Sequence, residues 1–156
     1  MVDIGCGPSP CALAATDVWG GAVRELHYWG IDPSRIARTL AERMAKNFLP
    51  DGDGRWRSDI PKPGGGLWEN LSARPALVVF HISGLFGCVS PRRTEKLTQI
   101  ISGVMRRYID NRYVLAVCQS ESDAQLAPAQ VMARWAAENN VTLWQRDWTD
   151  DACPLS

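Results

Sequence analysis

The first eleven residues place two glycines close behind a carboxylate, at the end of a short apolar segment. They are Met-Val-Asp-Ile-Gly-Cys-Gly-Pro-Ser-Pro-Cys. Gly5 and Gly7 lack the Cβ that would stop the backbone from turning sharply and approaching a ligand. A phosphate-binding turn would have its third glycine at Pro10, and the negative charge of Asp3 would repel a pyrophosphate. The turn therefore favours a cationic or neutral ligand over a dinucleotide.

A second carboxylate, Asp32, ends a second apolar segment and directly precedes a helical pattern. A carboxylate in this place can accept hydrogen bonds from both ribose hydroxyls of a nucleoside. Asp32 is also suited to cap the helix that Pro33 would begin. The two roles are compatible, because a carboxylate has two oxygens.

Together, these two motifs resemble those of the class I S-adenosylmethionine-dependent methyltransferases. The first motif of that family looks like residues 3–7, Asp-Ile-Gly-Cys-Gly, and its second strand often ends as residues 30–34, Gly-Ile-Asp-Pro-Ser, do. The resemblance covers positions 1 to 146. It implies S-adenosylmethionine as the cofactor and transfer of its methyl group to a small molecule, an RNA or a protein.

The resemblance also implies a set of binding residues. They are Asp3, Gly5, Cys6, Gly7, Asp32, Pro33, Asp59 and Ile60. By resemblance, Asp3 holds the amino-acid end of the cofactor through water or backbone, and Asp59 accepts from the adenine amino group while Ile60 lies against the ring. Asp59 is equally well explained as a loop residue before Pro61.

His81 is the candidate catalytic residue. It ends the strand predicted from the apolar run at 76–80, where the family places residues that face the methyl group and the acceptor. An imidazole with a pKa near 6.5 could act as a general base. The alternative is a histidine that lines the cofactor pocket and forms hydrogen bonds. No Asn/Asp-Pro-Pro-Tyr/Phe motif stands at this position, so the resemblance does not extend to enzymes that methylate exocyclic amines of bases.

Apolar strand patterns alternate with helical patterns along the whole chain. Strands are expected at 1–4, 26–31, 55–58, 76–80, 113–118 and 141–144, and helices from 10, over 33–47, from 91 to 108 and over 128–139. This order predicts an α/β fold, a Rossmann-like three-layer sandwich with a mostly parallel central sheet. Residues 1–146 would form the cofactor-binding domain and 147–156 a C-terminal tail. The 33–47 helix would bury an apolar face of Ile36, Ala37, Leu40, Ala41 and Met44.

Composition narrows the classes of protein. Seventeen basic and seventeen acidic side chains cancel, so net charge gives no attraction to nucleic acid, and no apolar run is long enough to span a bilayer. A basic cluster on the 91–108 helix keeps nucleic-acid contact open, although such clusters usually form a solvated helix face. Five cysteines without Cys-x-x-Cys spacing and only two histidines predict no metal site. With no signal peptide pattern, the expected compartment is the cytoplasm.

Two further classes of function stay open. One is a non-catalytic or truncated methyltransferase-fold domain that acts as a binding or scaffold subunit, and the other, disfavoured by Asp3 and Pro10, is a nucleotide-binding oxidoreductase. The first strand is predicted to be too short to pair along its length, and the chain is either a minimal core or a fragment. We therefore expect it to form homo-oligomers or to bind a partner chain.

Overall fold

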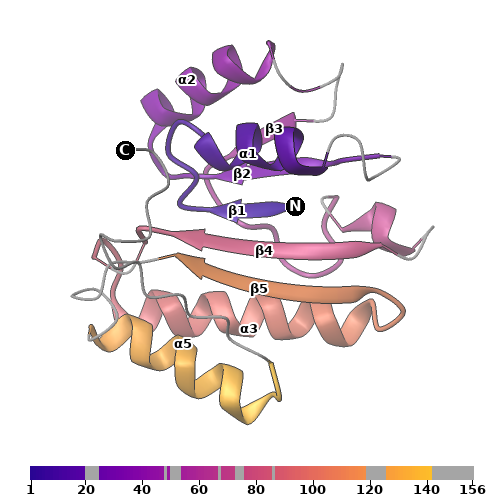
Figure 1. The fold of residues 1–156 in the computed structure, drawn as a ribbon. Coiled ribbons are helices and arrows are strands. Elements are labelled where there is room, and N and C mark those ends of the chain that lie inside the picture. Colours follow the sequence, from indigo (N-terminus) through magenta and orange to yellow (C-terminus); the bar gives the residue numbers. More distant parts are fainter. Residues whose placement is uncertain are drawn as a thin grey trace.

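Five parallel strands and four α-helices make up the described part of the chain (Figure 1). The computed structural model describes residues 1–19, 25–47, 49, 54–66, 68–72, 76–85, 87–118 and 126–141. The strands are β1 (Val2–Ile4), β2 (Tyr28–Ile31), β3 (Gly54–Arg57), β4 (Leu77–Ser83) and β5 (Arg112–Cys118). The helices are α1 (Pro10–Trp19), α2 (Arg35–Ala45), α3 (Pro91–Arg107) and α5 (Ala127–Glu138), with a short 3-10 helix at Glu69–Ser72.

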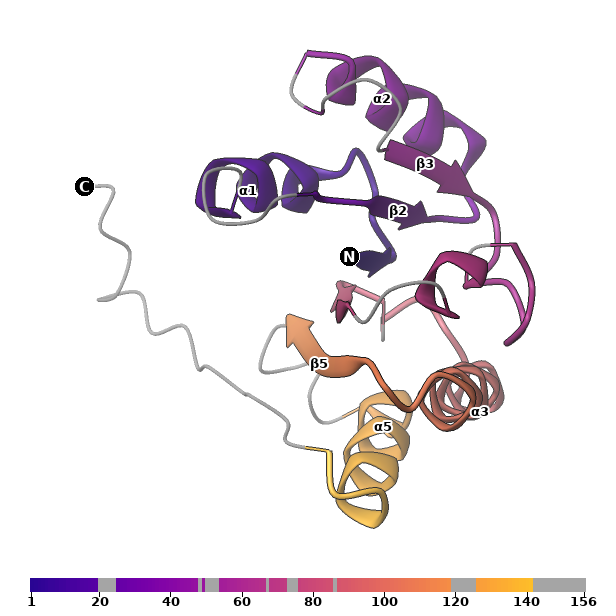
Figure 2. The same cartoon turned by 90° about the vertical axis from the view of Figure 1, so that its right-hand side faces the viewer.

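The sheet order is β3-β2-β1-β4-β5, and every neighbouring pair is parallel. Figure 2 views the strands nearly end-on and shows α1 and α2 on one side of the sheet, with α3 and α5 on the other. The predicted Rossmann-like three-layer sandwich is therefore confirmed. In such sheets, the carboxyl ends of the strands share one edge, where ligands bind.

β1 is central in the sheet although it has only three residues. Each of them pairs with a residue of β2 and with a residue of β4, so the expectation that this strand is too short to pair along its length is wrong. The apolar side chains of β1, Val2 and Ile4, lie beside Phe80 and Ile82 on the face that α3 covers. Asp3 points to the opposite face, as the alternation of side chains along a strand requires.

The buried surface of α2 differs from the prediction. Ile36 is 83% exposed and Leu40 is 47% exposed, whereas Ala41 and Ala45 are buried. Small side chains let this helix lie close to the sheet, whereas Ile36 and Leu40 point outward. The helix also begins later than predicted, because Ser34 is its N-cap and Pro33 precedes it.

Other boundaries shift by a few residues. β4 continues through Ser83, three residues beyond the predicted end, and Ser90 precedes α3 as its N-cap without a side-chain capping bond. The predicted last strand at 141–144 falls mostly, and the tail at 147–156 wholly, outside the described residues. Among the helices described, none has the length and apolar character needed to cross a membrane.

Phe80 provides a test of the packing in the core. Its side chain is 1% exposed, and its ring centroid lies 6.0 Å from that of Trp68 and 6.3 Å from that of Tyr113. Phe80→Ala is expected to lower the free energy of unfolding by about 3–5 kcal/mol, because it leaves a cavity between sheet and helices. Leu77→Ala is the matched control, since Leu77 lies on the same strand but is 59% exposed, and should cost less than about 0.5 kcal/mol. Urea unfolding measures both, and equal losses would contradict the packing described.

Candidate functional site

The backbone amides of the turn between β1 and α1 all have hydrogen-bond acceptors within the protein. The N–H groups of Gly5 and Cys6 both donate to the Ile31 carbonyl, at 2.8 and 3.2 Å, and the N–H of Ser9 donates to the Cys6 carbonyl at 2.7 Å. The N–H of Gly7 donates to a carboxylate, Asp32 Oδ2, at 3.0 Å. Residues 8 and 10 are prolines and have no N–H. No amide from residue 5 to residue 10 is therefore left to cradle a phosphate.

Asp32 joins this turn to the start of α2. Its second oxygen, Oδ1, accepts from the backbone N–H of Ser34 at 2.7 Å, and the Ser34 hydroxyl accepts from the N–H of Ala37 at 3.2 Å. Ser34 rather than Asp32 thus caps the helix, and Asp32 forms a turn before it. A carboxylate has about four acceptor positions, so each oxygen of Asp32 retains one for a further donor.

Four strand ends meet at this edge of the sheet. The backbone N–H of Asp32 donates to the Arg57 carbonyl at 3.0 Å, which holds the end of β2 against the end of β3. A Cβ on Gly5 would stand 2.7 Å from the Ser83 carbonyl oxygen, so the turn also lies directly against the end of β4. Asp59 is exposed and Ile60 is half-buried, two and three residues after β3.

Trp56 packs across the turn in a way that the sequence analysis did not predict. Its ring lies over Gly30, where an added Cβ would be 2.5 Å from the indole, and its Nε1 donates to Ser9 Oγ at 2.9 Å. Glycine inside a strand is the sequence signal for such a close approach. Cys6 is buried in the same place, and burial raises the pKa of its thiol to about 11. Any contact of Cys6 with a ligand would therefore involve its backbone.

The carboxylate of Asp3 is fully buried and has a partner on each oxygen. Tyr28 donates its hydroxyl to Oδ2, and His81 Nδ1 lies 2.8 Å from Oδ1. Burial and the neighbouring charge of Asp3 raise the pKa of Tyr28 well above its usual value, so its hydroxyl stays protonated. The Asp3 side chain is thus held away from the turn's surface, and only its backbone or these partners connect it to a ligand there.

His81 uses both ring nitrogens within the protein. Opposite Asp3, its Nε2 lies 3.3 Å from Cys118 Sγ and 3.8 Å from Cys11 Sγ. Burial disfavours the charged imidazole, but the hydrogen bonds to Asp3 and Cys11 outweigh it and raise the pKa of His81 to about 11. His81 is 8% exposed. This arrangement favours the predicted hydrogen-bonding role of His81 over the general-base role.

The thiols of Cys11 and Cys118 are the functional candidates that the sequence analysis missed. Cys11 is the second residue of α1 and Cys118 the last residue of β5, so they lie 70 and 37 positions from His81 along the chain. Metal-ligand motifs place pairs of ligands a few residues apart, and no such spacing exists here. Only the topology of the sheet brings these side chains together.

The basic residues of α3 do not form one patch. Arg92, Arg93 and Lys96 are exposed near the start of the helix, and Arg106 and Arg107 are exposed at its end. Lys96 and Arg106 are ten positions apart, which is about 15 Å along the helix. The two groups are therefore typical of basic residues on a solvent-exposed helix face.

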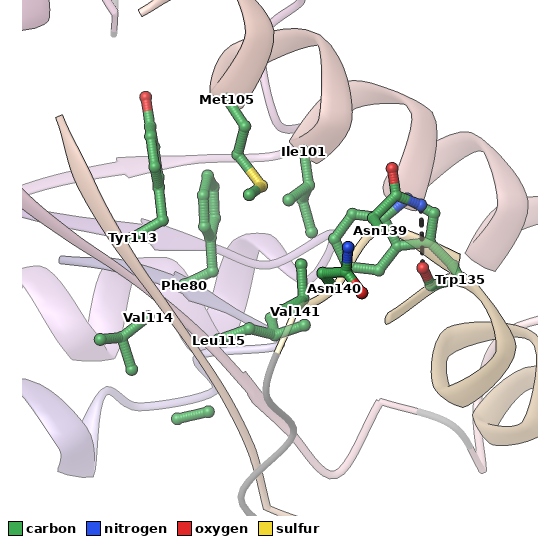
Figure 3. Close-up of a pocket in the computed structure, with 11 residues that line it drawn as sticks. Phe80, Ile101, Met105, Tyr113, Val114, Leu115, Trp135, Asn139, Asn140 and Val141 are labelled. Atoms are coloured by element: carbon green, nitrogen blue, oxygen red, sulfur yellow. Dashed lines mark hydrogen bonds between the residues drawn. The ribbon is translucent and has the colours of Figure 1, made fainter. Parts of the chain in front are cut away.

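A separate cavity of about 410 Å³ lies at the other side of the molecule, between α3, α5 and the outer strand β5 (Figure 3). Its walls include Phe80, Met105, Tyr113 and Trp135, and they are mostly apolar. None of the residues expected to bind the cofactor lines it. This cavity is therefore distinct from the site at the carboxyl edge.

Comparison with known proteins gives little. No protein-family model matches the chain, and no curated protein matches it. Among solved structures, it is similar to one described as a precorrin 8w decarboxylase from Methanobacterium thermoautotrophicum, with 17% identity over 73% of this chain and a TM-score of 0.40. The match spans about half, 51%, of that protein's length. At this TM-score, the likeness carries no argument about function.

The turn yields a prediction about its two glycines. Gly7→Ala should cost about 1–2 kcal/mol of folding free energy, because its φ of +50° is left-handed but no described atom beyond its chain neighbours lies within 4 Å of the added Cβ. Gly5→Ala should cost about 1–3 kcal/mol more, since its φ is +77° and the Cβ meets the Ser83 backbone. Urea unfolding compares the two variants. An equal loss of folding free energy would mean that the end of β4 does not lie in contact with the turn at Gly5.

Proposed function

We propose that this protein binds S-adenosylmethionine at the carboxyl edge of β1, β2 and β3 and transfers its methyl group to an acceptor. The observation that carries the proposal is the turn at residues 5–10. A dinucleotide or nucleotide turn directs free amides at phosphate, whereas here the Gly7 amide already donates to Asp32 and the other amides are bonded or absent. This surface suits a ligand that carries positive charge.

S-adenosylmethionine has the groups that fit this edge. Its ribose hydroxyls can donate to the acceptor positions that remain on Asp32, and its adenine can lie between Asp59 and Ile60 at the end of β3. Its sulfonium and α-ammonium are cations, which the carboxylate of Asp32 beside the turn attracts. The space beside Gly7 leaves room for close approach, because a Cβ added there would meet no described atom other than its chain neighbours.

The residues of this edge would act mainly by positioning. When bound, the sulfonium supplies a methyl group that an in-line nucleophile can take. The protein must then align donor and acceptor and exclude water, which needs no dedicated base when the nucleophile is unprotonated. His81, bonded at both nitrogens, stiffens the wall formed by β1 and β4.

The second candidate is a domain that binds the same cofactor without turnover, as a scaffold subunit or with a partner chain. The burial of His81, the candidate base, favours it. Leu77 and Val114 also favour a partner, since both are apolar and exposed and both lie on the sheet face opposite α3. A methyl-transfer assay on the isolated chain separates the two candidates.

Ligand-dependent melting tests the choice of cofactor. S-adenosylhomocysteine at about 100 times its Kd should stabilise the fold by roughly 2.7 kcal/mol and raise the Tm by about 5–10 °C. NAD should leave the Tm unchanged, because its pyrophosphate finds no free amide at the turn. A rise with NAD alone would end the methyltransferase proposal.

Substitution of Asp32 tests the ribose contact. Asp32→Ala should weaken S-adenosylhomocysteine binding by about 1.5–3 kcal/mol, since a charge-assisted hydrogen bond is lost, and Asp32→Asn should cost less. Glu42→Ala, an exposed acidic residue of α2, is the control and should bind as the unsubstituted protein does. Titration calorimetry measures all three. Unchanged binding in both Asp32 variants would reduce Asp32 to a structural turn residue.

A further inference from the structure

Three potential metal ligands converge beside Asp3, on the sheet face that carries α1. Nε2 of His81 faces the sulfur of Cys118 at 3.3 Å and the sulfur of Cys11 at 3.8 Å. The three residues come from β4, β5 and the first turn of α1, so the core of the fold sets their positions. His81 is buried, Cys11 is half-buried and Cys118 is exposed. The exposed thiol gives an ion a path from solvent.

We propose that these residues form a binding site for Zn²⁺ or a similar thiophilic divalent cation, with His81 Nε2, Cys11 Sγ and Cys118 Sγ as ligands. Imidazole nitrogen and thiolate sulfur are the donors that zinc prefers. This inference is independent of the proposed function, because it uses neither the turn amides nor Asp32.

Both distances from His81 Nε2 to the sulfurs agree with a shared metal ion. In a tetrahedral zinc site, with Zn–N about 2.0–2.1 Å and Zn–S about 2.3 Å, the nitrogen and each sulfur are about 3.6 Å apart. The two observed separations, 3.3 and 3.8 Å, lie on either side of this value. The position of His81 Nε2 relative to each sulfur therefore agrees with a shared ion.

The surroundings of His81 are those of a metal-binding histidine. Such histidines usually donate the N–H of the other ring nitrogen to a carboxylate, which fixes the tautomer and makes the free nitrogen a better ligand. Here Nδ1 lies 2.8 Å from Asp3 Oδ1, and Tyr28 donates to the other oxygen of the same carboxylate. The arrangement orients Nε2 toward the two sulfurs before any ion arrives.

Asp3 also influences the charge of the site. A cation bound through His81 Nε2 and two thiolates would displace the protons of these groups, and it would replace the imidazolium as the positive group beside the buried carboxylate of Asp3. Asp3, Cys11 and His81 also offer one ligand atom each within 4.8 Å of one another, so Asp3 is close enough to replace Cys118 as a ligand. We assign Asp3 to the outer shell because both its oxygens already have partners. Three protein ligands leave a fourth position for water or substrate.

The test is metal binding by the reduced full chain. Zn²⁺ should bind at one ion per chain in competition with a chelator, and Co²⁺ should produce a thiolate-to-metal charge-transfer band. Cys11→Ser, Cys118→Ser and His81→Gln should each weaken binding more than the about 10- to 100-fold expected when an outer partner is lost. Tyr28→Phe should cost less than any of these. Circular dichroism reports whether each variant is folded.

Cys88→Ser is the matched control, because Cys88 is an exposed free cysteine and makes no contact with His81 among the described interactions. It should keep full affinity and the full cobalt band. Absence of stoichiometric metal binding would overturn the proposal, as would unchanged affinity in folded Cys118→Ser. A loss in Cys88→Ser as large as in Cys11→Ser would also overturn it, because binding would then not depend on this cluster.

Discussion

The buried carboxylate of Asp3 is the constraint around which the rest of the structure is arranged. It is fully buried at the middle of the sheet, where an uncompensated charge would cost several kcal/mol. Tyr28 from β2 and His81 from β4 supply the hydrogen bonds that make its burial tolerable. A three-residue strand has little apolar surface with which to hold its neighbours. The polar bonds of Asp3 therefore add to the backbone ladder in fixing β1 between β2 and β4.

The turn that follows β1 determines what the carboxyl edge of the sheet can bind. Because Gly5 must pass within contact of the Ser83 backbone, the chain leaves β1 in a tight turn, and the amides of this turn donate to Ile31, Cys6 and Asp32. A turn with unbonded amides would attract anions. Here those amides are bonded and the carboxylate of Asp32 lies beside them, which is the electrostatic basis of the proposed preference for a cationic nucleoside over a dinucleotide.

Local patterns in the sequence predicted much of this fold. The alternation of apolar runs with helical patterns gave the parallel sheet, and the positions of Asp32 and Asp59 after successive strands placed both at one edge. Two residues of the predicted buried face of α2, Ile36 and Leu40, were wrong and Ala41 was right, because amphipathic spacing does not show how closely a helix must lie on its sheet. Ile36 and Leu40 have the right period, yet both are exposed, whereas Ala41 and Ala45 are buried.

The cluster around His81 could not be predicted from spacing, since its members are joined by strand order alone. Cys11 follows β1 and Cys118 ends β5, and they approach one histidine only because β4 lies between those two strands. A count of cysteines with no short-range pairs argued against a metal, and the proposed site differs from that expectation because a sheet can bring together single ligands from separate elements. The residue pairing of β4 with β5, Ser83 with Cys118, was the missing information.

Asp3 links the two proposed sites, and this limits which substitutions can distinguish them. A change at Asp3 would disturb β1, the turn and the orientation of His81 together, so an effect on either cofactor or metal binding would be ambiguous. Asp32 and Cys118 avoid the difficulty. Asp32 follows β2 and Cys118 ends β5. These strands are three strand spacings, or about 14 Å, apart, which exceeds the separation at which substitutions usually become additive. Effects at these two positions should therefore report on the nucleoside edge and the thiol cluster separately.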